Sequence, residues 1–138
     1  MNTIFLIGRI LFAVLFLFSA VGHLSQTAAM TGYSKSKGVP FPQLAVIASG
    51  VLFCLGALSV LLGVWGDLGA LVLAAVLIPT CFFMHAFWKE TDAMAKQTEM
   101  TTFIKNVALM GGALAFFVAF QVVRGLAITG PLFNLHIS

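Results

Sequence analysis

The sequence predicts an all-α protein, a polytopic membrane four-helix bundle with a short interfacial helix between its first and second membrane spans. Of its 138 residues, 61% are hydrophobic and only 8% are charged, whereas a soluble domain is about 45–50% apolar and about 25% charged. The charged residues gather between four apolar runs of 21 to 23 residues. About 20 helical residues cross a hydrocarbon core. Because backbone polar groups in lipid must be bonded internally, such runs can cross only as helices.

The predicted spans are residues 4–24, 43–65, 68–88 and 102–124, within one transmembrane domain of residues 1–138. The first run, IFLIGRILFAVLFLFSAVGHL, is apolar apart from Arg9 and His23. A cleaved signal peptide is the alternative for this run. The apolar stretch is long, its charge lies inside it, and no A-x-A site follows, so a membrane span is favoured.

The connections between the spans differ in character. The segment SQTAAMTGYSKSKGVPFP is too polar to span, but Ala29, Met30 and Tyr33 recur at helical spacing, which predicts an interfacial helix near residues 26–37. Gly66 and Asp67 leave a tight turn between the second and third spans, which predicts an antiparallel hairpin. We expect Pro79 to kink the third span, and residues 89–102 to form a charged loop.

Small residues within the spans indicate where helices touch, because they let helix backbones approach closely in lipid. The residues expected at these contacts are Gly56, Gly63, Gly111, Gly112 and Ala115.

Because consecutive spans run antiparallel, each ionisable residue falls near one of the two membrane surfaces, here called the first and the second face. On the first face we expect Arg9 to form a polar pair with Asp67 across the mouth of the bundle, or to reach the lipid headgroups. A site for an anionic ligand or a lipid headgroup is the alternative.

The second face carries the candidate ligand site. His23 and His85 are expected at similar depth, with Lys105 and Asn106 near them and Tyr33 supplied by the interfacial helix above. Histidine can donate, accept and titrate, so this group could hydrogen-bond a quinone carbonyl. Interfacial histidines bonded to backbone or phosphate are the alternative. Two histidines without further ligands do not predict a metal or haem site.

Two cysteines lie in apolar runs, Cys54 in the second span and Cys81 in the third. Their offset from the predicted turn places them about 4–5 Å apart along the helix axis. A redox pair usually occupies an electropositive setting near a surface, so two small buried side chains are the favoured interpretation.

Four stretches resemble the DoxX family of small four-helix membrane proteins: LFLFSAVGHL with the preceding arginine, GYSKSKGVPFP, FFMHAFW and FIKNVALMGGALAF. The resemblance covers nearly the whole chain and implies the same four-helix fold. It also implies a link to quinone chemistry, because the family is related to subunits of thiosulfate:quinone oxidoreductase. Two features depart from the family pattern. The second span lacks the acidic residue of many members, and Asp67 stands in a turn that is basic in many of them.

The leading functional hypothesis is an accessory or assembly subunit of a membrane complex, with a redox complex as the candidate, in the plasma membrane of a prokaryote. We expect it to have no catalytic activity of its own, and its partners to be membrane lipids, other membrane subunits or further copies of the chain. A quinone-linked oxidoreductase component with a pocket at His23 and His85 is the alternative, with quinone as the candidate cofactor. A transporter is less favoured, because the middle of all four spans is apolar. No basic cluster suggests nucleic acid.

Orientation is left open by the sequence. Five lysines on the loop side against two arginines on the other would place both long loops in the cytoplasm. The resemblance favours the opposite orientation, because relatives with a basic second turn are expected to have their N-terminus inside.

Overall fold

The computed structural model describes residues 1–135 and confirms the all-α fold class. Its main elements are α1 (Asn2–Ser25), α2 (Thr27–Ser36), α3 (Pro42–Leu62), α4 (Gly66–Pro79) and α5 (Ala93–Val122). A π-helical segment, η1 (Thr80–Met84), and a 3₁₀ turn, η2 (Phe87–Lys89), follow α4. Four helical segments of the described chain are long and apolar enough to cross a membrane, as predicted: Asn2–Ser25, Pro42–Leu62, Gly66–Lys89 and Ala93–Val122.

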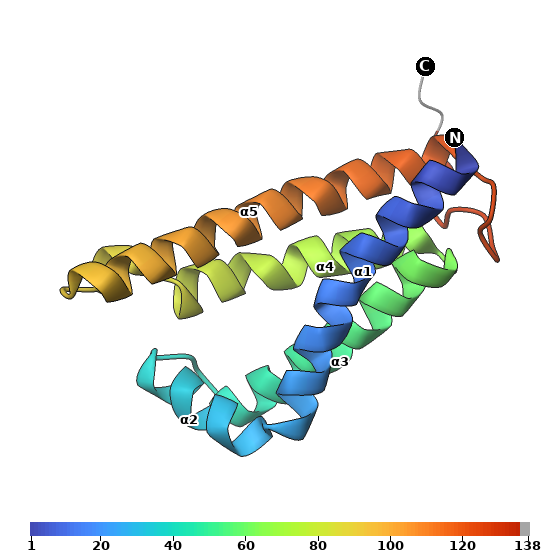
Figure 1. Cartoon of the computed structure of the whole chain (residues 1–138). Coiled ribbons are helices and arrows are strands. Elements are labelled where there is room, and N and C mark those ends of the chain that lie inside the picture. The colour runs from blue at the N-terminus through green and yellow to red at the C-terminus, as the bar shows by residue number, and fades with distance from the viewer. Residues whose placement is uncertain (136–138) are drawn as a thin grey trace.

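The long helices form two pairs that converge at one end of the molecule. In chain order α1 packs on α3, α3 on α4, and α4 on α5. Figure 1 shows the pairs meeting near the N-terminus and the α3–α4 turn, and diverging toward the end that carries α2 and the start of α5. At the converging end α1 meets α5 through phenylalanine rings, with Phe5 on Phe120 and Phe12 on Phe116, at centroid distances of 5.0 and 4.9 Å.

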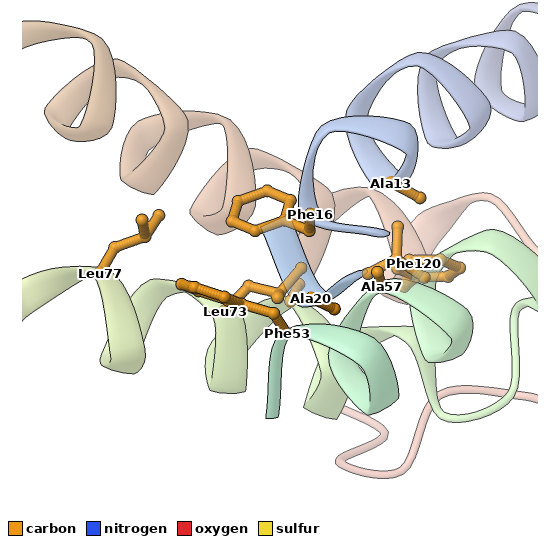
Figure 2. Packing of buried hydrophobic residues seen from close by; sticks show 10 residues of the cluster. Ala13, Phe16, Ala20, Phe53, Ala57, Leu73, Leu77 and Phe120 are labelled. Carbon is orange, nitrogen blue, oxygen red and sulfur yellow. The ribbon is translucent and has the colours of Figure 1, made fainter. Parts of the chain in front are cut away.

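The core lies where all four long helices meet (Figure 2), and its residues alternate between small and large side chains. Alanines 13, 20, 57 and 70 let the backbones approach, while Phe16, Phe53, Leu73 and Phe120 fill the space between them. Such interlocking matters in lipid, where close packing replaces the hydrophobic effect as the force that joins helices.

The hairpin turn lies three residues earlier than predicted. It comprises residues 63–65, with Gly63 and Trp65 in left-handed conformation at φ +68° and +47°, while Gly66 and Asp67 form the first turn of α4. Glycine adopts that conformation without a steric penalty, so Gly63 ends α3. A carboxylate in the first turn of a helix is favoured by the helix dipole, which explains the position of Asp67.

Two further boundaries differ from the prediction. The third span does not stay α-helical to residue 88, because it changes to η1 at Thr80, directly after Pro79. The fourth helix starts at residue 93 rather than 102, so most of the predicted charged loop is helical. Asp92 caps this start by accepting a hydrogen bond from the Ala95 amide at 2.9 Å.

The small residues divide into two groups. A Cβ on Gly56 would lie 2.9 Å from the Leu73 side chain, so Gly56 is a helix contact, and Gly69 across the hairpin is an even tighter one. A Cβ on Gly112 would lie 3.4 Å from the Phe12 ring, so Gly112 also faces another helix. Within the described chain, Gly111 has open space around it and Ala115 is exposed, so neither contacts another helix of the same chain.

Candidate functional site

The buried Arg9 at the converging end is held by backbone carbonyls. Its Nε donates to Val60 O at 2.8 Å, one terminal nitrogen donates to Leu61 O at 2.6 Å, and the other donates to Leu126 O at 2.8 Å. Phe5 and Phe120 flank the guanidinium, each with its ring centroid 5.5 Å away. The first two carbonyls belong to the last turn of α3, where carbonyl groups have no hydrogen-bond partner within the helix. A cation is therefore stabilised at this position, which also carries the negative end of the helix dipole.

The predicted pair of Arg9 with Asp67 is not present. Asp67 is fully buried and instead accepts hydrogen bonds from the Leu132 and Phe133 amides, both at 2.9 Å. It also accepts from the Gln121 side-chain amide at 3.1 Å, and Gln121 in turn accepts from the Leu135 amide. The alternative in which Arg9 reaches the lipid headgroups is also excluded, since only 1% of the residue is exposed.

These contacts show what the two buried charges do. The segment 126–135 follows α5 and crosses back over the α3–α4 turn, where the Ile128 amide donates to Leu62 O and the Thr129 amide to Gly63 O. Arg9 binds the beginning of this segment at Leu126, and Asp67 binds its later part at Leu132 and Phe133. The first polar face is therefore a structural clamp for residues 126–135.

A cavity of about 290 Å³ lies at the diverging end, between α1, α2, α3 and the third span. Most of its wall is apolar, including Met30, Val46, Val76 and Phe83. His23, Tyr33 and His85, three of the five residues predicted for a ligand site, all line it. An apolar pocket with a few convergent polar groups is the usual form of a small-molecule site, although about 300–1,000 Å³ is the common size.

His23 enters this cavity from α1 and is fixed through one ring nitrogen. Its Nδ1 lies 2.8 Å from Ser49 Oγ and 3.2 Å from Val46 O, both on α3. The Ser49 hydroxyl donates to Val46 O at 3.0 Å, so its oxygen is free to accept the His23 Nδ1–H. Nε2 has no hydrogen-bond partner within residues 1–135.

His85 reaches the cavity because the third span loses its α-helical form. Pro79 has no backbone N–H and so cannot continue the hydrogen-bonding pattern of the α-helix. The Thr80 hydroxyl instead donates to Val76 O at 2.9 Å, and the π-helical turn begins at this residue. Such π segments occur often at functional sites. His85 itself is non-helical, at φ −121° and ψ 40°.

The ring of His85 meets the carboxylate of Glu99, with Nδ1 2.7 Å from Oε2. An ionised carboxylate only accepts, so Nδ1 carries the hydrogen. Both side chains are largely shielded, with 20% and 15% of their surface exposed. As with His23, the contact through Nδ1 leaves Nε2 without a hydrogen-bond partner among the described residues.

Glu99 is the centre of a network that ties α2 to α5. The Tyr33 hydroxyl donates to its Oε1 at 3.2 Å, and Lys37 Nζ lies 3.8 Å from the same oxygen. Lys37 also donates to Glu90 at 3.0 Å, and this hydrogen bond raises the pKa of Lys37 above its ordinary value. Lys37 and Glu90 line a second, more polar cavity of about 510 Å³ at the surface, and Phe83 lines both cavities.

The remaining two predicted residues lie away from the cavity. Lys105 is exposed on α5, and Asn106 is buried with its side chain against the Cys81 thiol. Cys54 and Cys81 are both free thiols. No group of three or more His, Cys, Asp or Glu side chains within residues 1–135 is arranged to hold a metal ion.

Glu99 was missed by the sequence reasoning because its segment looked like a loop. A periodicity could have revealed it. Glu99, Asn106, Ala113 and Phe120 are spaced seven residues apart, and the last three are buried in α5. Residues at that spacing share one helix face, so Glu99 was placed on the inward face of a longer helix.

Fold and site together define a polytopic four-helix membrane protein with a polar-headed cavity near one end. A family model described as DoxX matches residues 4–86, which is more than half of the chain. The chain belongs to the DoxX family. The matched segment includes His23, Tyr33 and His85 but ends before Glu99. No curated protein and no solved structure matches the chain at a significant level.

Proposed function

We propose that this protein binds a quinone in the cavity at its diverging end, as the ligand-binding component of a quinone-linked membrane complex. The observation that supports this most directly is that His23 and His85 line one mostly apolar cavity. Each is held through Nδ1, and within residues 1–135 neither Nε2 has a hydrogen-bond partner. Because Nδ1 carries the ring hydrogen in both, each Nε2 accepts a hydrogen bond. The hydroxyl groups of a quinone in its reduced form can donate to these nitrogens, and its apolar tail can lie in the surrounding lipid. Quinone is the preferred ligand because both its ends match the cavity and its surroundings.

The test is direct binding of a decyl-substituted benzoquinone in its reduced, hydroquinone form to the purified protein in lipid nanodiscs, with oxygen excluded. His23→Phe and His85→Phe, singly and together, are expected to weaken binding, because each removes a hydrogen-bonding group and keeps an aromatic ring. One lost hydrogen bond corresponds to about a fivefold change and two to more than tenfold. Lys105→Gln is the matched control, since this exposed residue lies outside the cavity. Equal binding by the double variant and the wild type would refute the proposal.

A role as an accessory subunit is favoured by a separate observation. Gly111 and Ala115 expose small side chains on the outer face of α5, together with Ala108. Faces of this kind usually pack against another helix in lipid. We therefore propose that α5 contacts another membrane subunit or a second copy of the chain. Gly111→Leu should then disrupt a complex isolated from native membranes, and an intact complex would exclude this contact.

We also propose the plasma membrane of a prokaryote as the location, based on the family to which the chain belongs. Membrane fractionation of the source cells, with the protein detected by an antibody, tests this assignment.

A further inference from the structure

Two hydroxyl groups in the wall of the cavity at the diverging end donate their hydrogens to other groups of the protein. The Tyr33 hydroxyl donates to Glu99 at 3.2 Å, and the Thr80 hydroxyl donates to Val76 O at 2.9 Å. A hydroxyl oxygen whose hydrogen is used in this way can still accept a hydrogen bond. Ser34 also lines the cavity, and its hydroxyl can take either role. A ligand therefore meets more acceptors than donors among these hydroxyl groups.

The two histidines of the cavity are acceptors as well, and each is fixed by a different set of partners. The Nδ1–H of His23 has two acceptors on α3, Ser49 Oγ and Val46 O, at 2.8 and 3.2 Å. The Nδ1–H of His85 has the Glu99 carboxylate at 2.7 Å. In each ring Nε2 is then left with a lone pair and no hydrogen. A ligand hydroxyl can donate to such a nitrogen, whereas a carbonyl oxygen would bring a lone pair against a lone pair.

Glu99 controls this property of His85 without lining the cavity itself. An ionised carboxylate only accepts, so it holds the ring hydrogen on Nδ1. An imidazole without such a partner favours the opposite form, with its hydrogen on Nε2. The carboxylate is held in turn by the Tyr33 hydroxyl and by Lys37, whose Nζ lies 3.8 Å away. The position of Glu99 on α5 thus determines which ligand groups His85 can bind.

We propose that the cavity selects the reduced, hydroquinone form of its ligand over the oxidised quinone, and that Glu99 is the positioning residue that sets this preference by holding the His85 hydrogen on Nδ1. The two hydroxyl groups of a hydroquinone donate hydrogen bonds, whereas the two carbonyl groups of a quinone only accept them. The reaction that supplies this ligand is a quinone reduction. The inference rests on the proposed function, and adds to it the preferred redox form and the residue that determines it.

The test compares three ligands that differ only in their hydrogen-bonding groups. They are the decyl-substituted hydroquinone, the corresponding benzoquinone, and the dimethyl ether of the hydroquinone, which keeps the ring but has no donor. Binding is measured to the protein in nanodiscs, with oxygen excluded, at about pH 8, where a histidine of ordinary pKa is neutral. The hydroquinone should bind more than about tenfold more tightly than either of the others, because it alone donates two hydrogen bonds.

Variants assign the preference to Glu99. Glu99→Gln should reduce it severalfold, because a glutamine amide can donate to Nδ1 and so allow the His85 hydrogen to move to Nε2. Glu99→Asp keeps an acceptor and should retain the preference. Glu90→Gln is the matched control, since Glu90 binds the same Lys37 but lines the outer cavity. NMR of isotope-labelled histidine reports which ring nitrogen of His85 carries the hydrogen, and a merely structural role for Glu99 would leave it unchanged.

The outcomes separate this inference from the proposed function. Quinone binding by the wild type that is as tight as hydroquinone binding, or a hydrogen on Nε2 of His85, overturns the inference and leaves the proposed function standing. An unchanged preference in Glu99→Gln overturns the role of Glu99. If that variant folds poorly, the ligand comparison and the NMR spectrum of the wild type still decide the matter. Absence of hydroquinone and quinone binding overturns the proposed function and this inference together.

Discussion

Removal of the Asp67 carboxylate should undo the clamp on residues 126–135. In the variant Asp67→Ala, the amides of Leu132 and Phe133 and the side chain of Gln121 all lose their acceptor. Hydrogen bonds to a charged group contribute about 1.5–3 kcal/mol each. The sum is an upper limit, because removing the carboxylate also removes the cost of burying it. We expect a loss of about 3–5 kcal/mol in the free energy of unfolding, as for other broken buried charge networks.

The matched control is Asp92→Ala, the same substitution at an exposed carboxylate that accepts one backbone hydrogen bond. Loss of this helix cap should cost about 1 kcal/mol. Both variants are measured by reversible denaturation in mild detergent, and protease cleavage near the C-terminus reports release of the segment. If Asp67→Ala is no less stable than Asp92→Ala and its C-terminal segment stays protected, the clamp does not hold the segment.

Three further predictions concern other parts of the molecule. Gly69→Ala should destabilise the protein by about 1–3 kcal/mol, because the added Cβ would meet a backbone carbonyl oxygen at 2.9 Å. Gly111 lies in open space, so Gly111→Ala is the control. It should be neutral or stabilising by up to about 1 kcal/mol in the same detergent denaturation assay. Arg9→Lys should lower the melting temperature more than Arg124→Lys, since one ammonium cannot reach all three carbonyls that the buried guanidinium contacts; equal melting temperatures would contradict this. Lys37 has a raised pKa, so its ion pairs stabilise the docking of α2 at neutral pH and are lost only as pH rises through that raised value. Hydrogen exchange of α2 should therefore increase at strongly alkaline pH in the wild type, whereas Lys37→Met should show that higher exchange already at neutral pH.

Much of the fold was determined by the sequence alone, because hydropathy is a local property. Four apolar runs of the required length can be read directly from the sequence. The connection between the second and third runs is only two residues long, which predicted a hairpin. The short helix near residues 26–37 was also predictable from spacing, and it is present as Thr27–Ser36. Where local signals competed, boundaries moved by several residues, as at Gly63 and at the start of α5.

The convergence of His23, Tyr33 and His85 on one side was predictable in outline, since antiparallel threading sorts residues by depth. Threading does not specify how each helix is rotated about its own axis. In the structure this rotation places His85 in the cavity, whereas Lys105 faces outward on α5. The same limit applies to Gly111 and Ala115, whose small side chains indicate close packing without indicating which surface they face.

Only the tertiary structure decided the partners of the buried charges. Opposite charges at one end of a bundle suggested that Arg9 pairs with Asp67, yet each is bonded mainly to backbone groups supplied by segments far away in the chain. Helix ends and the turns of residues 126–135 leave carbonyls and amides without partners of their own, and a buried ion is stabilised by whichever of these the fold brings to it. Sequence shows that a buried charge needs a partner, whereas the packing of the whole chain determines which atoms provide it.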